Sequence, residues 1–410
     1  MRILLLGDVG VLDDMVHIGD EAMFEEFASQ LRRRGVTSLT GLSSNPDETR
    51  RRYGLDAIPG IGFSPAVVGD RAAQEERMGL VLRTADGESG LLESDDPAHG
   101  VIAAVREADG VAVSGGGNMA SIWPMHIFER ATLAALAARF GKPFVVSGQT
   151  IGPELEGDDR DLTARLLGSA RLIGLREAAS AALVRELGVT GDGVESTIDD
   201  ASFLGVDRAA EAPAADSPEV APYCAVTLAA HVGGLDRDAF AEATARLLDR
   251  VAAETGLEIV FFAHFASLRG PGDERGDSLA HRRVIDRMTQ PSRIEPTTDS
   301  IAAARFARGA SLAVSSRYHP AIFAVSAGVP TVGIAVDDYT TVKLTGALGN
   351  FGQSSVVTAR DVLDGRATDV ALDTWRASDA IRSTWASRIE PTRAASDAWW
   401  DRVTATLTGR

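Results

Sequence analysis

An arginine and a histidine two residues apart, Arg317 and His319, are the residues of this chain best suited to hold an anion. They follow the apolar, β-prone segment 312–316 and precede Pro320 and the apolar segment 321–327. This pattern predicts a buried strand, a short polar turn and a helix that starts near the proline. Free N–H groups at a helix start attract anions, and ligands of open α/β sheets bind at the carboxyl ends of strands. We therefore predict an anion site at this turn.

A second set of polar side chains lies near the N-terminus. A predicted strand over residues 2–7 is followed by a loop and by a helix that begins near Glu21. Asp20 is placed to cap this helix and Glu21 to lie in its first turn, so both have ordinary structural explanations. His17 has one as well, because a single histidine in a loop commonly serves as a hydrogen-bonding group. Beside these structural roles, the three residues are candidates for contact with a substrate.

Glycines and amide side chains follow two further predicted strands. The segment 114–118 reads SGGGN, and its glycines permit close approach of a ligand or of another loop to the backbone. No Gly-Lys-Ser/Thr follows, so the segment is not a Walker-type phosphate loop. An amide side chain here could bind a sugar hydroxyl or a phosphate. The candidate binding residues of this group are Gly115, Gly116, Gly117, Asn118 and Gln149.

Two cations, Arg176 and Lys343, are candidates for additional contacts with an anion. Arg176 is predicted to leave a strand end just before a helix. Lys343 follows Tyr339 by four residues, so in a helix the two side chains share a face, although an exposed surface lysine is the alternative. Asp199 and Asp200 resemble half of a metal site, but no second acidic cluster follows them. We interpret the pair as buried capping or hinge residues and predict no metal.

Composition restricts the possible functions. The chain has 410 residues, so two domains are expected. Its net charge of −17 argues against non-specific binding to nucleic acid and against a basic membrane-binding surface. The single cysteine, Cys224, excludes an internal disulfide framework and a cysteine-rich zinc site. No apolar run approaches the ~20 residues of a membrane span, and the N-terminus turns polar too early for a signal peptide, so we predict a cytoplasmic protein.

The order of predicted elements indicates an α/β protein with two Rossmann-like domains facing a cleft. Alternating strands and helices extend over residues 1–207, interrupted by a region from about 60 to 100 that is predicted to be irregular. They restart at residue 223, after a segment rich in alanine, proline and acidic residues. The predicted organisation is an N-terminal, acceptor-side domain over 1–207, a linker over 208–222, a C-terminal domain with the donor anion site over 223–370, and a helical tail over 371–410. We expect the C-terminal helix to pack back across the domain interface.

The chain resembles the polysaccharide pyruvyl transferase family over nearly its whole length. The most specific mark is SRYHP at 316–320, followed by AGVP at 327–330. In one place the chain departs from the family pattern, because His17 stands where the family often has asparagine, two residues before GDEA. The other stretches that carry the resemblance are GDEA at 19–22, SGGGN at 114–118, GQTIGP at 148–153, LRE at 175–177, and the pair Asp200 and Ala201.

The resemblance implies a fold similar to the two-domain glycosyltransferases of the GT-B type. It also implies an enzyme that takes part in the biosynthesis of a polysaccharide of the cell envelope. Such an enzyme transfers pyruvate from phosphoenolpyruvate to a sugar of a cell-surface polysaccharide or its precursor, which gives a cyclic ketal and phosphate. Phosphoenolpyruvate is then the donor substrate, and no cofactor is implied.

Roles for individual residues follow from this resemblance and from the chemistry of the donor. Arg317 and the helix start would hold the donor anion, and His319 would donate a proton or contact the leaving phosphate. Arg176 and Lys343 would add positive charge. Asp20 would be the base that accepts a proton from the acceptor across the cleft.

Two other functions remain open from the sequence. A GT-B-type glycosyltransferase that uses a nucleotide sugar would keep the fold and the anion site, and a non-catalytic saccharide-binding protein would keep the cleft. The sequence does not indicate the acceptor sugar, the regiochemistry of the ketal or the oligomeric state. It also leaves open whether the acceptor is linked to a nucleotide or to a lipid, which would bring the protein into peripheral contact with a membrane.

Overall fold

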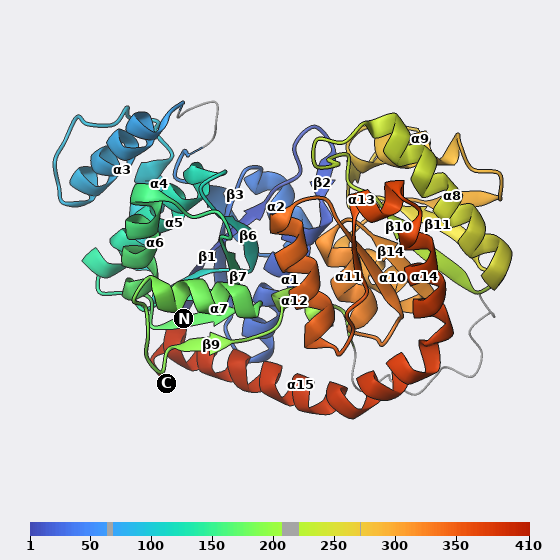
Figure 1. Cartoon of the computed structure of the whole chain (residues 1–410). Coiled ribbons are helices and arrows are strands. Elements are labelled where there is room, and N and C mark those ends of the chain that lie inside the picture. The colour runs from blue at the N-terminus through green and yellow to red at the C-terminus, as the bar shows by residue number, and fades with distance from the viewer. Residues whose placement is uncertain (64–68, 207–220, 271) are drawn as a thin grey trace. The chain divides into compact units, whose positions relative to one another are not determined.

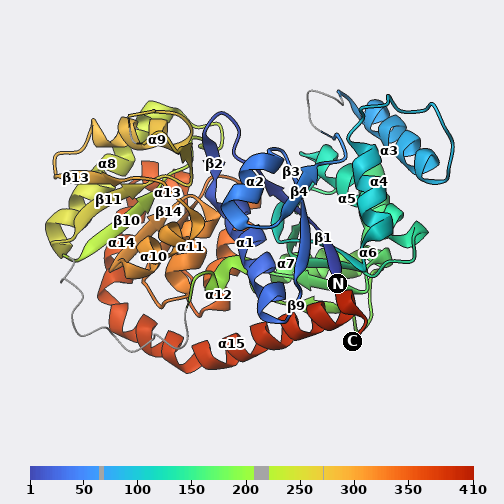
Figure 2. The ribbon, with the colours of Figure 1, turned by 180° about the vertical axis from the view of Figure 1, so that it is seen from behind.

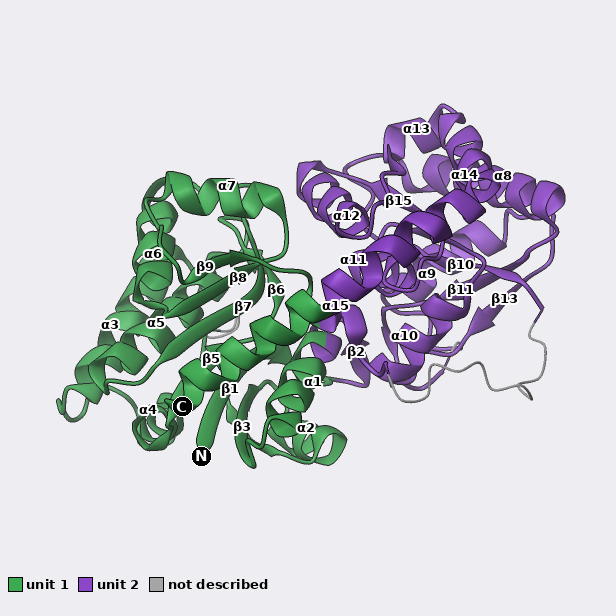
Figure 3. Cartoon of the chain, turned by 90° about the horizontal axis from the view of Figure 1, so that it is seen from below, with its two compact units in different colours: residues 1–12, 23–200, 394–410 green, residues 13–22, 201–393 purple. Residues whose placement is uncertain are grey.

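The computed structural model describes residues 1–63, 69–206, 221–270 and 272–410 (Figure 1). The chain divides into two compact units, which Figure 3 shows in two colours. Unit 1 consists of Met1–Leu12, Met23–Asp200 and Ala394–Arg410. Unit 2 consists of Asp13–Ala22 and Ala201–Arg393.

Unit 1 is built on a parallel sheet of eight strands in the order β4-β3-β1-β5-β7-β8-β9, with β6 paired to β7. The strand order reverses between β1 and β5, and we call the carboxyl ends of these two strands the switch point of unit 1. Ligands of doubly wound sheets bind at such points. The strands are β1 (Arg2–Val9), β3 (Ser38–Ser43), β4 (Asp56–Pro59), β5 (Gly110–Val113), β6 (Gly116–Met119), β7 (Phe144–Ile151), β8 (Leu172–Leu175) and β9 (Val194–Ser196).

Both faces of the unit 1 sheet are buried, which explains the continuous apolar run of β1. Ile3 and Leu5 pack on one face with α1 and the last turns of α15, while Leu4 and Leu6 pack on the other with α4, α5 and α6 (Figures 1 and 2). The helices of this part of the chain are α1 (Ile18–Arg33), α2 (Pro46–Tyr53), α3 (Arg71–Ala85), α4 (Ala98–Glu107), α5 (Pro124–Arg139), α6 (Gly157–Ser169) and α7 (Ala178–Glu186), followed by the 3-10 turn η1 (Asp200–Phe203).

Unit 2 repeats the architecture with a parallel sheet of six strands in the order β13-β11-β10-β14-β15-β16. Its order reverses between β10 and β14, whose carboxyl ends form the switch point of unit 2. The strands are β10 (Tyr223–Thr227), β11 (Glu258–Phe262), β13 (Ser292–Glu295), β14 (Leu312–Ser315), β15 (Thr331–Ala335) and β16 (Val356–Thr358). The helices are α8 (Arg237–Thr255), α9 (Asp277–Ile285), α10 (Ser300–Gly309), α11 (Tyr318–Val325), α12 (Asp338–Asn350), α13 (Ala359–Leu363), α14 (Arg366–Arg376) and the part of α15 (Ser378–Thr408) up to Arg393.

A short antiparallel ribbon changes the domain boundaries predicted from the sequence. Strand β2 (Met15–His17) pairs with β12 (Phe265–Ser267), so the segment 13–22 belongs to unit 2. The prediction that residues 1–207 form one N-terminal domain is therefore wrong for this segment. Residues 201–206 also group with unit 2.

The C-terminal part is helical, as predicted, but it does not form one separate tail. Residue 371 lies inside α14, and α15 is divided between the units after Arg393. Trp385 donates its indole N–H to the carbonyl oxygen of Ser326 at 3.0 Å in unit 2. Trp399 and Trp400 join the core of unit 1. The predicted linker over 208–222 lies outside the described residues, apart from its last two.

The prediction of an α/β protein with two Rossmann-like parallel-sheet units is confirmed. The cleft and the packing of the C-terminal helix across an interface stay predictions. Among the described residues, no helix combines the length and apolarity needed to cross a membrane, and the cytoplasmic location stays a prediction.

Candidate functional site

The SRYHP turn lies at the switch point of unit 2, between the end of β14 and the start of α11. The hydroxyl of Ser315 accepts a hydrogen bond from the Arg317 N–H at 3.0 Å and donates one to the Arg317 carbonyl at 2.8 Å. The hydroxyl of Ser316 accepts from the N–H of Ala229, in the loop after β10, at 2.8 Å. These bonds fix the turn against both central strands. Helix α11 begins at Tyr318, so Pro320 is its third residue and not, as predicted, its first.

Asp277, a residue not predicted from the sequence, holds the guanidinium of Arg317. Arg317 Nε lies 3.1 Å from both carboxylate oxygens, and Nη2 lies 2.5 Å from Oδ1. Asp277 is fully buried, and its Oδ2 also accepts from the backbone N–H groups of His264 and Phe265 at 3.2 and 2.9 Å. The side chain of Arg317 is 26% exposed. One edge of the guanidinium is therefore fixed by the protein.

His319 packs directly against the GDEA segment. Its ring is 7% exposed and meets the ring of Tyr318 edge-on, with the centroids 5.1 Å apart. A Cβ atom added to Gly19 would lie 2.1 Å from His319 Nδ1, far inside contact distance. Only glycine fits at this point, so the two stretches that carry most of the family resemblance meet inside unit 2.

His17 and Asp20 form a pair beside this contact. His17 Nδ1 lies 2.9 Å from Asp20 Oδ2, and their side chains are 43% and 26% exposed. Burial opposes the charged imidazole, but the carboxylate of Asp20 outweighs it and raises the pKa of His17 above its ordinary value. Asp20 lies inside the first turn of α1, which begins at Ile18, and is not the residue before the helix.

His17, Asp20 and Glu21 were predicted to belong to the N-terminal, acceptor-side domain. The structure corrects this assignment, because all three lie in unit 2 with Arg317 and His319. Glu21 is 2% exposed. The catalytic role of Asp20 and the binding roles of His17 and Glu21 stay predictions.

Two further buried histidines, His264 and His281, belong to the same unit and were missed. His264 follows β11 and is 2% exposed, and its carbonyl oxygen accepts from Ile18 N at 2.8 Å. Burial, with the nearby charges of His319 and Arg317, holds its pKa well below the ordinary value. His281 Nε2 accepts from Leu228 N at 2.9 Å, and burial lowers its pKa to about 4. The position of His264 at a strand end was the available sequence signal.

Lys343 and Tyr339 share a face of α12, as predicted. Lys343 Nζ lies 3.0 Å from the Tyr339 hydroxyl and 4.9 Å from the ring centroid of Tyr318. The cation therefore contacts the residue between Arg317 and His319, and its contact with a substrate stays a prediction.

The glycine-rich segment and Gln149 lie in unit 1. Gly115 N donates to Asp200 Oδ2 at 2.9 Å, and Asn118 Nδ2 donates to Asp8 Oδ2 at 2.7 Å. Gln149 is fully buried, and its Nε2 donates to the Ser114 carbonyl at 2.6 Å. The segment was predicted to be a loop, but residues 116–119 form the short strand β6 beside β7. Substrate contacts of Gly115, Gly116, Gly117, Asn118 and Gln149 stay predictions.

Arg176 lies within a buried ion-pair network of unit 1. Its Nη1 is 2.6 Å from Asp199 Oδ2, and its Nε is 3.0 Å from Glu177 Oε1. The neighbouring Asp200 also accepts from the Ser147 hydroxyl at 2.7 Å, and burial raises its pKa to about 7. This burial agrees with the interpretation of Asp199 and Asp200 as structural residues. The predicted substrate contact of Arg176 is not supported by this position.

The switch point of unit 1 carries a different charged group. Asp8, near the end of β1, lies 2.6 Å from Arg130 Nη2 and 3.3 Å from His126 Nδ1. Asp8, His126 and Glu129 are close enough together to be considered as metal ligands. However, the Arg130 guanidinium already neutralises the carboxylate of Asp8, so this group gives no reason to change the prediction of no metal.

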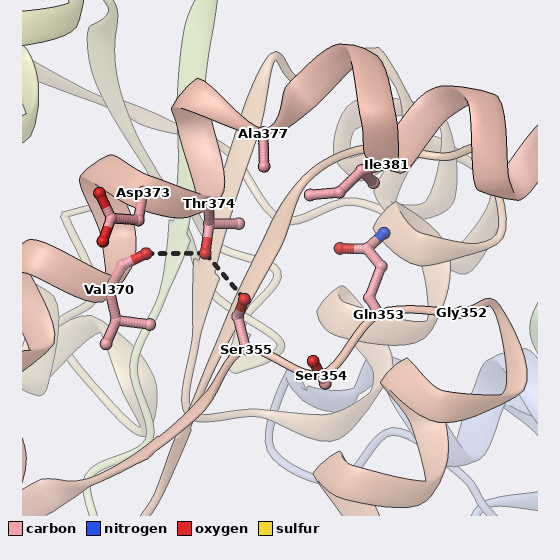
Figure 4. Close-up of a pocket in the computed structure, with 9 residues that line it drawn as sticks. All are labelled: Gly352, Gln353, Ser354, Ser355, Val370, Asp373, Thr374, Ala377 and Ile381. Atoms are coloured by element: carbon pink, nitrogen blue, oxygen red, sulfur yellow. Dashed lines mark hydrogen bonds between the residues drawn. The ribbon is translucent and has the colours of Figure 1, made fainter.

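A separate pocket of about 340 Å³ lies in unit 2 between the segment before β16 and the helices α14 and α15 (Figure 4). Thr374 Oγ1 donates to the Val370 carbonyl at 2.7 Å and lies 2.8 Å from the Ser355 hydroxyl. Among the described residues, its lining includes none of the predicted site residues. The lining residues are Gly352, Gln353, Ser354, Ser355, Val370, Asp373, Thr374, Ala377 and Ile381.

Solved structures share this architecture over the whole chain. The UDP-GlcNAc 2-epimerase of Neisseria meningitidis, bound to UDP-GlcNAc, is 10% identical with a TM-score of 0.58, and 100% of each chain is covered. MnaA of S. aureus, solved with UDP, is 11% identical with a TM-score of 0.61, over 99% of this chain and 97% of its own. MurG of Acinetobacter baumannii is 11% identical with a TM-score of 0.50, over 98% of both chains. These likenesses show the fold, which is that of the GT-B glycosyltransferases and related epimerases.

The sequence identifies the family within that fold. The family model described as polysaccharide pyruvyl transferase matches residues 17–338. The chain therefore belongs to the polysaccharide pyruvyl transferase family. No curated protein sequence matches the chain. The matched region begins at His17, so it contains both the GDEA segment and the SRYHP turn.

Proposed function

We propose that the protein transfers pyruvate from phosphoenolpyruvate to two hydroxyl groups of a sugar, forming a cyclic ketal and releasing phosphate. One observation carries this proposal. His319 and Arg317 lie at the switch point of unit 2 with Gly19 packed against the imidazole, and one edge of the guanidinium is fixed by Asp277. A fixed guanidinium beside a helix start suits a small dianionic donor better than it suits a neutral ligand.

The proposed donor site combines one guanidinium edge with backbone dipoles. Asp277 compensates part of the charge of Arg317, so the guanidinium acts mainly as an oriented pair of hydrogen-bond donors. The first N–H groups of α11 supply further donors. Lys343, which contacts Tyr318, adds a second cation near the turn. Together these groups would hold the carboxylate and phosphate oxygens of phosphoenolpyruvate.

The proposed chemistry consists of proton transfers and two additions at one carbon. A proton is added to the methylene carbon of phosphoenolpyruvate, and the oxygen of a first sugar hydroxyl bonds to the adjacent carbon while that hydroxyl loses its proton. The bond from this carbon to the phosphate oxygen then breaks. The second hydroxyl adds at the same carbon, and its proton leaves with the phosphate, which balances the reaction.

The groups proposed to move these protons are His319 and the His17–Asp20 pair. We assign His319 to proton donation and to contact with the leaving phosphate, because it lies on α11 two residues after Arg317. Asp20, with His17 at 2.9 Å, is assigned to accept the proton of an acceptor hydroxyl. The acceptor would be a saccharide of a cell-envelope polysaccharide or of its precursor.

The test is phosphate release from phosphoenolpyruvate with a panel of nucleotide-linked and lipid-linked saccharides. We expect release that depends on the saccharide, and a product whose mass is increased by one ketal-linked pyruvate. His319→Ala should lose most turnover, whereas His99→Ala, at an exposed site on α4, should not. Release of a nucleotide from a nucleotide sugar, with none of phosphate from phosphoenolpyruvate, would instead identify a glycosyltransferase. Binding of saccharide without either product would identify a non-catalytic protein.

A further inference from the structure

The imidazole of His264 is buried next to the proposed donor site. The residue is 2% exposed, and neither Nδ1 nor Nε2 has a partner among the described residues. Its ring meets Phe262 edge-on with centroids 4.9 Å apart and lies 5.9 Å from the ring of Phe323. Phe323 is also 6.2 Å from the ring of His319, so the two imidazoles share one aromatic neighbour.

The backbone of His264 is hydrogen-bonded both to the partner of Arg317 and to the start of α1. Its N–H donates to the carboxylate of Asp277, which holds Arg317, and its carbonyl oxygen accepts from Ile18 at the start of α1. The groups that affect its titration are His319, Arg317, His17 and His281. Burial and the nearby guanidinium of Arg317 keep the ring uncharged, and an uncharged imidazole always carries one N–H donor and one acceptor nitrogen.

A polar ring in this position costs stability. A buried donor without a partner costs about 1–3 kcal/mol, whereas an apolar side chain of similar shape would cost nothing comparable. Residues that lower stability in this way are often retained for function. In structures without substrate, hydrogen bonds of an active site are often not yet formed, and side chains adjust when the ligand binds.

We propose that His264 is a further donor-binding residue, whose uncharged imidazole donates a hydrogen bond to an anionic oxygen of phosphoenolpyruvate after a small rotation of the ring. This inference rests on the proposed function of the same site. It adds an uncharged hydrogen-bond donor to a site in which the charge of Arg317 is already compensated by Asp277. The carboxylate and the phosphate of phosphoenolpyruvate are both anionic, and the test distinguishes which of them His264 contacts.

The test measures binding of phosphoenolpyruvate by calorimetry, together with the unfolding temperature, for the full-length chain and its variants. His264→Leu should raise the dissociation constant about ten- to hundred-fold, the loss expected for one hydrogen bond to a charged group. Its unfolding temperature should stay the same or rise. His264→Asn retains an N–H donor and should recover part of the affinity. Phe262→Leu is the matched control, because it changes packing around the same ring without removing a donor.

Each outcome decides the inference. Unchanged affinity in His264→Leu would overturn it, as would equal losses of affinity and stability in His264→Leu and Phe262→Leu. The same calorimetry is repeated with inorganic phosphate and with pyruvate as ligands. If His264→Leu loses binding of only one of the two, the result supports the inference and shows whether His264 contacts the phosphate or the carboxylate. If the unaltered protein does not bind phosphoenolpyruvate, then the proposed function fails and this inference fails with it. If it binds and Arg317→Ala weakens binding while His264→Leu does not, only this inference fails.

Discussion

At the switch point of each unit an arginine pairs with an aspartate, but the two pairs differ in which partner is buried. In unit 1 the side chain of Arg130 is 2% exposed and that of Asp8 is 17% exposed. In unit 2 Asp277 is fully buried and Arg317 is 26% exposed. Unit 1 therefore presents a carboxylate to its surroundings, and unit 2 presents a guanidinium.

This difference shows that two sheets of the same topology can offer opposite charges at their switch points. An accessible guanidinium edge binds anionic oxygens, whereas an accessible carboxylate binds hydroxyl donors. In each unit the buried partner fixes the orientation of the accessible one. The comparison predicts that changes at the unit 2 pair affect donor chemistry most and that changes at the unit 1 pair affect stability most.

The largest effect is expected at Arg317. Arg317→Ala removes the only side chain of the SRYHP turn that offers a planar pair of donors, and it leaves the buried carboxylate of Asp277 unpaired. We expect kcat/KM for phosphate release to fall about 10³-fold, as for the loss of a charged group that stabilises a transition state. Arg317→Lys should recover little, because lysine lacks the planar fork. Arg246→Ala, at an exposed pair on α8, is the control, and equal losses in both variants would contradict the comparison.

Gly19→Ala tests whether the GDEA segment positions His319. The added Cβ would lie 2.1 Å from His319 Nδ1, so the imidazole must shift. A misplacement of about 1 Å at a reacting group costs about 10²-fold in kcat, and we expect a loss of this order. Gly100→Ala in α4 is the matched control, because nothing lies within 4 Å of its added Cβ. There alanine should stabilise the helix by up to about 1 kcal/mol. Normal turnover in Gly19→Ala would remove the positioning role.

Asp8→Asn tests the unit 1 pair through stability. Burial alone would raise the pKa of Asp8, but Arg130, His126 and Asn118 together hold it well below the ordinary value of 3.8. The carboxylate therefore contributes stability that is fully present above about pH 4 and is lost as the pH falls further. We expect Asp8→Asn to lower the unfolding free energy by about 2–4 kcal/mol at pH 7, with a difference that shrinks below pH 4. Denaturant unfolding at several pH values measures this, and a constant difference would refute the explanation.

Asp200→Asn should change stability with the opposite pH dependence. Burial raises the pKa of this acid to about 7 from 3.8. The folded state then retains a proton that the unfolded state loses, so the unaltered protein loses stability as the pH rises from about 4 to 7, by at most about 1.4 kcal/mol per pH unit. The asparagine variant lacks this titration. Its unfolding free energy relative to the unaltered protein should rise over that range, and parallel pH profiles would contradict the assignment.

The strand–turn–helix around Arg317 could be predicted because all of its signals are local. An apolar run, a polar turn, a proline and a terminal glycine lie within eighteen residues, and each has a direct conformational meaning. The same holds for the central strands β1, β5, β10 and β14, whereas the glycine-rich strand β6 was predicted to be a loop. Helix α3 was missed, since the region from 60 to 100 was predicted to be irregular. Its apolar residues do not gather on one face, so it has no helical periodicity to detect.

The partners of Arg317 and His319 could not be predicted, because they are brought together by contacts distant in sequence. Strand β2 has three residues and pairs with β12 about 250 residues later, too short and too remote for any periodic pattern. Asp277 is one of 58 acidic residues, and nothing local distinguishes it. The family resemblance indicated that Gly19 matters, but only the structure gives the physical reason, which is the ring of His319.

The division of α1 between the two units has a practical consequence for dissecting the protein. The chain changes unit after residues 12, 22, 200 and 393, so no single cleavage yields either sheet with all of its own segments. A fragment starting at residue 221 would carry Arg317 and Asp277 but would lack β2, and the edge of β12 would be left open. Producing unit 2 as a separate folded piece would therefore require grafting residues 13–22 back onto it, or supplying them as a synthetic peptide.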